Sequence, residues 1–430
     1  MKRTFCILMI MLMSITLFSC SKSGGAQHGG IVYVSDGELT YRDRERTEVL
    51  SELTEFPDEF SIYSYFNSPL EFCNYNLSSG RLFYPGGVNV LRPRDGMSPV
   101  SVDLYYKDLK SGEETEVAKD VHSYQVSTDG NVVTYQDART LYSLNLKTGE
   151  KLEIVSGLTD SFAASANGED VYYVINGALT KYNYFETEVI TEKNVLDIAL
   201  YDGETVFYTV DGGETEKLCA YDKNGIFDIA ENMHAVKAGK DGEYFVFVRS
   251  DDKRSNSGTI YSYKKTKSGF AEPKVVAESA NYSYFEVDGD GNPYFVFHED
   301  IFSEEPVLYC GETVVCDDKP VHKLMYASGA DIMYAMANNE LFICKDGKLD
   351  SVYEYESTVE DTDDIVYEFE DIDYITAPDG SIYVESETNN GVNYYALEDG
   401  ELTELAKNCP AYADVPKWLG IQRAPADPVK

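Results

Sequence analysis

One unit of sequence recurs from residue 31 to about residue 408, and this repeat restricts the fold more than any other feature of the chain. Each copy has a turn, a β-rich run around a tyrosine, a second run, a Gly turn and a third run. The clearest copy contains Asp129-Gly130, followed by VVTYQ, LYSLNL and LEIV over residues 132–155. The central tyrosines or their equivalents fall at residues 33, 84, 135, 173, 208, 246, 296, 334 and 383, in steps of 35 to 51 residues.

A period of this length suits four short strands per copy. The runs are rich in Val, Ile, Tyr, Phe and Thr, which fit a pleated sheet. The second turn of a copy contains a Gly, which readily adopts the positive φ that tight hairpins need. These turns are Ser111-Gly112, Asn224-Gly225, Ser268-Gly269, Asp346-Gly347 and Asp399-Gly400. Because no segment after residue 30 has a sustained 3.6-residue period, the chain is predicted to be all-β.

Units of this size cannot each bury a core alone, whereas closing them into a ring covers both their hydrophobic faces and their edges. We therefore predict a single β-propeller of four-stranded blades over residues 31–416, followed by a C-terminal tail at 417–430. Nine copies can be counted, but propellers most often have seven or eight blades, so eight are expected within a range of seven to nine. The first copy has no strand before it. Residues 411–415 are a candidate for that missing strand, which would close the ring.

Two segments carry the turn of the repeat most clearly, VSTDGNVVTY at residues 126–135 and TAPDGSIYV at 376–384. Their pattern resembles the TolB-type, WD40-like propeller repeat, in which Ser-x-Asp-Gly precedes a strand that ends in an aromatic residue. The resemblance implies a propeller fold and contacts with proteins or glycans outside the cytoplasm, but it implies no reaction. Inserts lengthen four copies and are expected at blade rims, where binding surfaces form. They are residues 55–77, 88–100, 251–257 and 355–366.

The first 19 residues are predicted to be an export signal. Two basic residues precede an apolar run at 5–18, which is shorter than the roughly 20 residues of a membrane-spanning helix. LFSC at 17–20 resembles the bacterial lipobox, which implies a diacylglycerol on Cys20. Residues 20–30 are rich in Gly and Ser and predict a flexible tether. We expect a lipoprotein of the cell envelope, anchored in the membrane and exposed outside the cytoplasm; an ordinary secretory signal is the alternative.

The chain carries 75 Asp and Glu against 36 Lys and Arg, which gives a formal net charge of −39. A uniform negative field opposes binding to nucleic acids and to anionic lipid headgroups, both of which depend on clustered Lys and Arg. With 43% hydrophobic residues, the chain nevertheless has ample material for a core. We expect a monomer that binds no nucleic acid and contacts the membrane through the lipid on Cys20.

The sequence lacks the common catalytic motifs. A single tryptophan, Trp418, excludes propeller families that place Trp in every blade. G-x-S-x-G, H-E-x-x-H, the P-loop and the dinucleotide fingerprint are all absent. We therefore expect a non-catalytic scaffold that binds an envelope protein, peptide or glycan and needs no cofactor. The alternative is a propeller that binds or processes a ligand or carbohydrate at a polar site in the mouth of its channel.

Five polar residues share one position of the repeat, several residues before the turn that opens the central run. They are His122, Asp160, His234, Asn281 and His322. In a propeller this position begins the innermost strand, so these side chains are candidates for a ring of ligands at one mouth of the channel. The alternative is that each one only hydrogen-bonds the neighbouring blade.

Two acidic segments are further candidates. Asp288, Asp290 and Asn292 have the alternating oxygen spacing of a calcium loop, but no Glu follows at the twelfth position. An ordinary Asx-Gly turn is therefore the alternative, and calcium is the one cofactor that the sequence leaves open. Residues 360–373 are dense in carboxylates, which indicates either a surface for a cationic partner or a solvated loop.

Six cysteines follow Cys20, and their spacing selects none of the fifteen complete pairings. Cys73 and Cys409 lie near the two ends of the predicted ring, where a disulfide would lock its closure. The alternative is six buried thiols that pack as small hydrophobic side chains.

Overall fold

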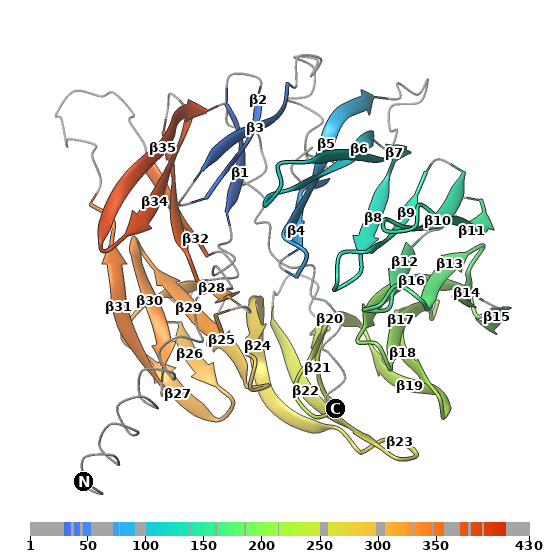
Figure 1. Ribbon diagram of the computed structural model, residues 1–430. Coiled ribbons are helices and arrows are strands. Elements are labelled where there is room, and N and C mark those ends of the chain that lie inside the picture. The colour runs from blue at the N-terminus through green and yellow to red at the C-terminus, as the bar shows by residue number, and fades with distance from the viewer. Residues whose placement is uncertain are drawn as a thin grey trace, which may run out of the picture.

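The computed structural model describes residues 30–35, 38–43, 46–52, 72–76, 78–90, 100–137, 139–157, 159, 161–184, 186–213, 215–249, 257–297, 306–327, 330–345, 347–356, 370–376, 380–388 and 391–409. Within these residues the chain is all-β, and its antiparallel sheets follow one another around a ring (Figure 1). The molecule is a β-propeller of nine blades. The predicted fold class is confirmed, with a blade count at the upper end of the expected range rather than the eight preferred.

Each blade is a meander whose strands run in chain order outward from the ring axis, except that blade 1 has three described strands. The strands of blades 1 to 5 are β1 (Ile31–Ser35), β2 (Glu38–Arg42) and β3 (Thr47–Glu52); β4 (Asn74–Asn76), β5 (Arg81–Val90), β6 (Val100–Asp108) and β7 (Glu114–Val121); β8 (Ser123–Val126), β9 (Val132–Gln136), β10 (Thr140–Asn145) and β11 (Lys151–Ser156); β12 (Ser161–Ala164), β13 (Val171–Ile175), β14 (Ala178–Asn183) and β15 (Glu186–Thr191); and β16 (Val195–Tyr201), β17 (Val206–Asp211), β18 (Glu216–Asp222) and β19 (Gly225–Glu231).

Blades 6 and 7 share one strand. β24 has 14 residues, and it pairs first with β22 of blade 6 and then with β25 of blade 7. The strands of blades 6 to 9 are β20 (Met233–Ala238), β21 (Glu243–Arg249), β22 (Ser257–Thr266), the short β23 (Gly269–Phe270) and β24 (Lys274–Val287); β25 (Pro293–Phe297), β26 (Val307–Cys310) and β27 (Thr313–Cys316); β28 (Val321–Ala327), β29 (Ile332–Ala337), β30 (Glu340–Lys345) and β31 (Lys348–Glu354); and β32 (Glu370–Thr376), β33 (Ile382–Thr388), β34 (Gly391–Glu398) and β35 (Glu401–Cys409).

The central run of every repeat forms a strand, as predicted. These nine strands are β1, β5, β9, β13, β17, β21, β25, β29 and β33. The tyrosine or valine at the equivalent position of each is at most 4% exposed: Tyr33, Tyr84, Tyr135, Tyr173, Tyr208, Val246, Val296, Tyr334 and Tyr383. Because a neighbouring blade covers each face of such a strand, the runs are almost continuously apolar instead of alternating.

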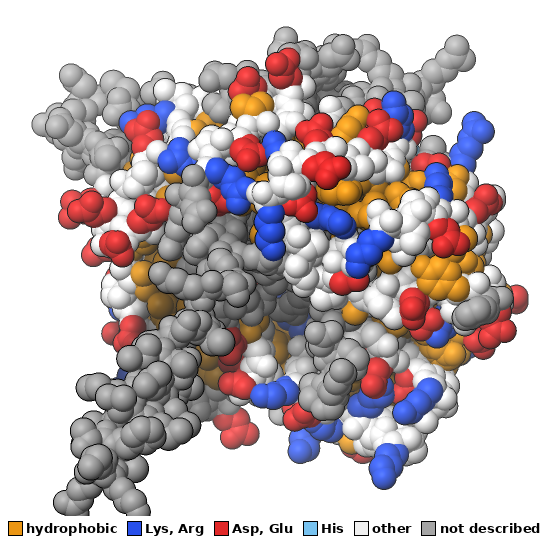
Figure 2. Space-filling model, viewed as in Figure 1, with side chains coloured by type: hydrophobic (Ala, Val, Ile, Leu, Met, Phe, Trp, Pro, Cys, Tyr) orange, Lys and Arg blue, Asp and Glu red, His pale blue; other side chains and the backbone are white. Residues whose placement is uncertain are grey.

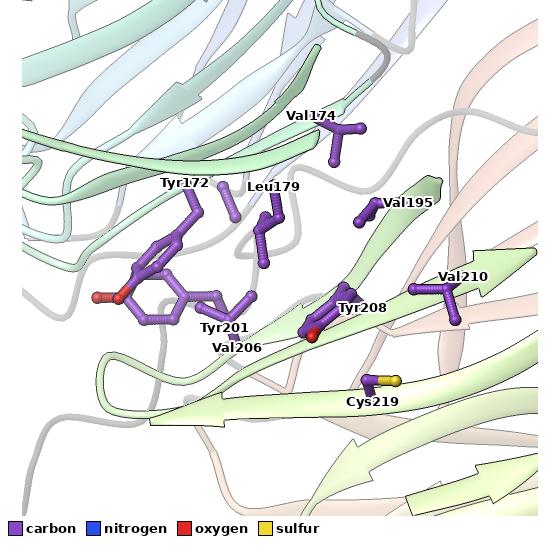
Figure 3. Close-up of a cluster of buried hydrophobic side chains, with 10 residues drawn as sticks. Tyr172, Val174, Leu179, Val195, Tyr201, Val206, Tyr208, Val210 and Cys219 are labelled. Atoms are coloured by element: carbon purple, nitrogen blue, oxygen red, sulfur yellow. The ribbon is translucent and has the colours of Figure 1, made fainter. Parts of the chain in front are cut away.

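Within the described residues the hydrophobic core consists of nine clusters of buried side chains, one between each pair of neighbouring blades. Figure 3 shows the cluster between blades 4 and 5, where Tyr172 and Leu179 of blade 4 pack with Val206 and Tyr208 of blade 5. Large aromatic side chains suit these spaces because flat rings fill the gap between two sheets. Inter-blade packing therefore accounts for much of the aromatic content.

The ring closes through side chains at the contact between blades 9 and 1. Ile31 and Tyr33 of β1 pack against Tyr383 and Tyr394 of blade 9, and the ring centroids of Tyr33 and Tyr394 are 5.7 Å apart. The opposite face of β1 packs against blade 2 through Val32. Blade 1 is thus buried on both faces, although the predicted closing strand at 411–415 lies outside the described residues, as do residues 1–29 and the tail at 417–430.

Tyrosine hydroxyls hydrogen-bond across the blade boundaries. Tyr124 donates to the Phe72 carbonyl at 2.6 Å, Tyr263 to the Ile229 carbonyl at 2.9 Å and Tyr374 to the Asn339 carbonyl at 2.5 Å. Tyr244 of blade 6 donates to the Asp202 carboxylate of blade 5. Buried hydroxyls need such partners, so these bonds fix how each blade sits on the next.

The predicted turns have the expected backbone. The glycines at 112, 225, 269, 347 and 400 all have φ between 70 and 137°. In the Ser-x-Asp-Gly turn, the Ser127 hydroxyl accepts the N–H groups of Asn131 at 3.1 Å and Val132 at 2.9 Å. This side chain therefore orders the turn that leads into β9, which explains why the motif precedes a strand.

All six cysteines of the described residues are thiols. Of the two alternatives left open by the sequence, the thiols hold and the disulfide between Cys73 and Cys409 does not form, because Cys73 packs between blades 1 and 2 whereas Cys409 packs between blades 9 and 1. Burial raises the pKa of the Cys344 thiol to about 12, which keeps it protonated and poorly reactive.

Replacing Val246 by Ala tests the inter-blade core. Val246 is fully buried between blades 5 and 6, so we expect Val246→Ala to lower the free energy of unfolding by about 2 kcal/mol. Val189, on the outer strand β15, is 54% exposed, so Val189→Ala should change the free energy of unfolding by less than about 0.5 kcal/mol. Urea unfolding followed by tyrosine fluorescence measures both; equal losses would contradict the assigned core.

Candidate functional site

The strands nearest the ring axis carry the polar groups that face the channel. They are β4, β8, β12, β16, β20, the second half of β24, β28 and β32 (Figure 1). Each has a hydrogen-bonded neighbour on its outer side only, so its inner edge needs other partners. Several of these strands stay accessible to solvent: Leu196 on β16 is 40% exposed, and all six residues of β20 are partly exposed.

Uncharged side chains link the inner strands of blades 3, 4 and 5. The Gln125 amide on β8 donates to the Phe162 carbonyl at 3.2 Å and accepts the Ala164 N–H at 2.7 Å. Farther along, the Ser161 hydroxyl on β12 accepts the Ile198 N–H of β16 at 3.1 Å. These contacts cross from blade to blade, and they satisfy backbone groups at the inner edges of β12 and β16.

Ion pairs make the corresponding links in blades 6 to 9. Lys237 on β20 pairs with Glu286 on β24 at 2.6 Å, between blades 6 and 7. Lys323 on β28 pairs with Asp373 on β32 at 2.5 Å, between blades 8 and 9, and also donates to the Tyr374 carbonyl at 3.1 Å. Four successive inner strands therefore present lysine, carboxylate, lysine and carboxylate. We call these four residues the charged inner rim.

Glu385 on β33 extends the charged inner rim at blade 9. It lies directly across from Asp373 in the sheet, and its Oε2 atom is buried without a hydrogen-bond partner in the described part of the chain. Burial is the main cause that raises the pKa of Glu385 to about 7, and the Asp373 carboxylate raises it further, against the Lys323 ammonium. Like charges directly opposite one another in a sheet repel, so the proton on Glu385 relieves that repulsion.

This arrangement has two chemical capacities. Alternating ammonium and carboxylate groups can bind a partner that carries both charges, and partial burial strengthens such contacts relative to those in open water. A carboxyl that titrates near neutral pH can also accept and return a proton. Both capacities belong to partly accessible side chains on rigid strands.

Of the five polar residues predicted to ring the channel mouth, His234 and His322 lie near the start of inner strands, and each has its own partner. The His234 ring nitrogen accepts a hydrogen bond from Arg249 at 3.1 Å, and burial followed by the Arg249 charge lowers its pKa. His322 contacts the Pro320 carbonyl at 3.3 Å. His122 immediately precedes β8, Asp160 lies outside the described residues, and Asn281 falls within β24. Among the described residues, no three His, Cys, Asp or Glu side chains converge as a metal site.

The loop predicted as a calcium site has the geometry of an Asx turn. The Asp288 carboxylate accepts hydrogen bonds from the Asn292 N–H at 2.8 Å and from its amide at 2.9 Å. Asp290 pairs with Lys240 of blade 6 at 2.9 Å. The two carboxylates therefore serve different partners, and calcium at this loop stays a prediction.

The remaining predicted features are only partly described. Of the acidic run at 360–373, residues 370–373 belong to β32, so part of it is an inner strand and not a loop. Cys20 and most of the four inserts lie outside the described residues. On the face in Figure 2, acidic and basic side chains are interspersed. Within the part of the chain that is described, no helix is both long enough and apolar enough to span a bilayer.

Sequence reasoning missed the charged inner rim, although the repeat contains a signal for it. Lys237, Glu286, Lys323 and Asp373 precede the central position of their copies by 9, 10, 11 and 10 residues (246 − 237, 296 − 286, 334 − 323, 383 − 373). Nearly equal offsets in four consecutive copies place these residues at equivalent points of neighbouring inner strands. Single lysines and carboxylates are so common that only this alignment distinguishes them from ordinary surface charges.

No protein-family model and no curated protein sequence matches the chain. Among solved structures it is similar to the dipeptidyl peptidase 4 of Porphyromonas gingivalis, with 12% identity and a TM-score of 0.49, over 85% of this chain and 65% of that one. It is also similar to a eukaryotic initiation factor, with 14% identity and a TM-score of 0.48, over 71% of this chain and 82% of that one. The acylaminoacyl peptidase of Pyrococcus horikoshii matches with 15% identity and a TM-score of 0.41, over 76% of this chain and 51% of that one. The chain thus spans about two thirds of the first of these proteins, and the propeller assignment rests on the strand pairing above.

Replacing Glu385 by Gln tests its proton. Between about pH 4.5 and pH 7 the folded protein keeps the proton that the unfolded chain has lost, so the stability of the wild type should fall as the pH rises through this window. Glu385→Gln removes this loss. Allowing for the partial exposure of Glu385, we expect the free energy of unfolding of the variant to exceed that of the wild type by roughly 1–2 kcal/mol at pH 8. At pH 5 the two free energies should be equal.

Urea unfolding at the two pH values measures the difference. Glu401→Gln makes the same change at an exposed position on β35 and should leave the wild-type pH dependence intact. An unchanged pH dependence in Glu385→Gln would show that Glu385 is ionised throughout.

Proposed function

We propose that this protein is a lipoprotein of the cell envelope whose propeller is a non-catalytic scaffold for binding another protein or peptide. The anchor follows from the signal at 1–19, the lipobox ending at Cys20 and the tether at 20–30. Attachment through acyl chains suits a chain with a net charge of −39, because it needs no basic patch on the protein.

The charged inner rim is the observation that carries the binding role. Its alternating charges, Lys237, Glu286, Lys323 and Asp373, suit a segment that bears both basic and acidic side chains. A polyanion would meet carboxylates on two of the four inner strands, β24 and β32, which favours a mixed-charge peptide over a nucleic acid. A neutral glycan would gain less from ion pairs, so we favour a protein or peptide partner.

A second candidate function rests on Glu385. A carboxyl with a pKa of about 7 beside a second carboxylate is suited to proton transfer, which favours a propeller that processes a ligand at the channel. The two candidates separate cleanly: Glu385→Gln should abolish turnover in the second and preserve partner binding in the first.

Replacing Cys20 by Ser tests the anchor. We expect the wild type to incorporate labelled palmitate and to sediment with membranes, whereas Cys20→Ser should do neither, because the acyl chains supply the attachment. Cys73→Ser is the matched control: it keeps Cys20 and removes a thiol in the core. Membrane sedimentation of Cys20→Ser at the wild-type level would contradict lipid anchoring.

Exchanging the two charges of an inner ion pair tests the binding surface. The double variant Lys237→Glu, Glu286→Lys keeps an ion pair and the net charge but reverses the local pattern, so it should reduce partner binding at least tenfold. The control is Lys217→Glu, Glu231→Lys, which reverses an exposed pair of blade 5 at 2.8 Å. Cross-linking in intact cells, followed by affinity purification and mass spectrometry, compares the two; equal recovery of every partner would exclude the charged inner rim as the contact.

A further inference from the structure

A cavity of about 230 Å³ lies between blades 1 and 9. Blade 1 contributes Arg42, at the end of β2, together with Asp43. Blade 9 contributes residues of β33, β34 and β35, so the cavity lies between middle and outer strands and not at the inner rim. It is a different site from the one proposed for partner binding, and it adds to that function.

Arg42 faces this cavity from the blade 1 side. It pairs across the sheet with Ile31, whose side chain packs in the cluster between blades 1 and 9, and directly paired residues project on the same face. Arg42 is partly buried, and within the described chain its guanidinium forms no salt bridge. A guanidinium is always charged, so a partly dehydrated one favours binding of an anion.

The nearby carboxylate of Asp43 already has other donors. Asp43 is 7% exposed and accepts the Tyr41 hydroxyl at 3.0 Å. It also accepts Arg46 twice, from the backbone N–H at 2.8 Å and from Nε at 3.0 Å. Since Arg46 neutralises Asp43, the charge of Arg42 is left for a ligand.

The other walls restrict what that ligand can be. Tyr383, Ala396 and Leu405, which pack in the cluster between blades 9 and 1, give the cavity an apolar side. At the roughly 30 Å³ that one water molecule occupies in the liquid, the volume corresponds to about eight waters, which suits only a small ligand. Glu398 also lines the cavity, and its negative charge opposes a second anionic group on the ligand. A planar guanidinium matches a carboxylate through two parallel hydrogen bonds.

We propose that the cavity between blades 1 and 9 binds a small monocarboxylate with an apolar chain, held by Arg42. The carboxylate pairs with the guanidinium, and the chain lies against the apolar wall. Glu398 is placed to favour a ligand that also carries an amino group, so a free apolar amino acid and its deamino counterpart are the two forms of this ligand class.

Calorimetric titration of the full chain in detergent tests the proposal with four probes: leucine, 4-methylpentanoate, 3-methylbutylamine and succinate. We expect the first two to bind with dissociation constants below about 10 mM and to raise Tm, because a ligand that binds only the folded state stabilises it. The amine and the dicarboxylate should bind at least tenfold more weakly. Tighter binding of leucine than of 4-methylpentanoate would identify the amino acid as the ligand form.

Two variants locate the binding. Arg42→Gln should weaken binding of both carboxylates at least tenfold, whereas Arg139→Gln, the same change at an exposed site of blade 3, should leave it unchanged. Thr403→Tyr places a bulky ring at the cavity from an exposed position and should block binding without lowering Tm. If Arg42→Gln fails to fold, this second variant still shows whether the ligand binds in the cavity. The proposal is overturned if neither carboxylate binds, if the amine binds as well as they do, or if Thr403→Tyr binds as the wild type does.

Discussion

Every blade of this ring depends on its neighbours for burial of its hydrophobic surface. Each core cluster of the described residues is shared by two adjacent blades, so a single blade would expose both of its faces. Blades 1 and 9 each have one face that only the other can cover. The contact between Tyr33 and Tyr394, which joins these two blades, is therefore required for burial of every blade. It belongs to the contact between the first and last blades, whose residues are far apart in the sequence, and closing so long a loop is costly in chain entropy.

Much of the fold could be predicted because the same pattern of strands and turns occurs in nine copies along the sequence. Each central run supplies apolar residues to both faces, and each Gly turn fixes a hairpin, so local pattern and final strand agree. The preference for eight blades followed the usual size of propellers, whereas the nine copies of the repeat match the nine blades. Among the described residues blade 1 has three strands, and Val32 packs toward blade 2 while Tyr33 packs toward blade 9. The shared strand β24 was also missed, because no change of composition separates its two halves.

The site was harder to predict because it is assembled from single residues of different copies. Lys237 and Glu286 are 49 residues apart, and Lys323 and Asp373 are 50 apart, so each pair exists only after the ring has formed. The histidines attracted attention as unusual residues in this chain, yet His234 and His322 bind partners within or next to their own strands. Burial of Glu385 likewise depends on sheet register, which places it across from Asp373. The sequence shows which residues carry polar or titratable side chains, but the topology of the strands determines which of these side chains contact one another.

The strand shared by blades 6 and 7 has a consequence for how such a ring can change in length. At two other boundaries between blades the chain bends at an asparagine with positive φ, Asn194 with φ of 42° or Asn232 with φ of 56°. A whole blade can be gained or lost between two such bends without interrupting a strand. β24 instead continues as one strand through its boundary, and its pairing shifts between Asn281 and Phe285, so a cut on either side of that shift breaks backbone pairing with β22 or β25. Duplication or loss of one blade at this point would destroy two. Blades 6 and 7 are therefore expected to be inherited together as a double unit, while the other seven are free to vary in number.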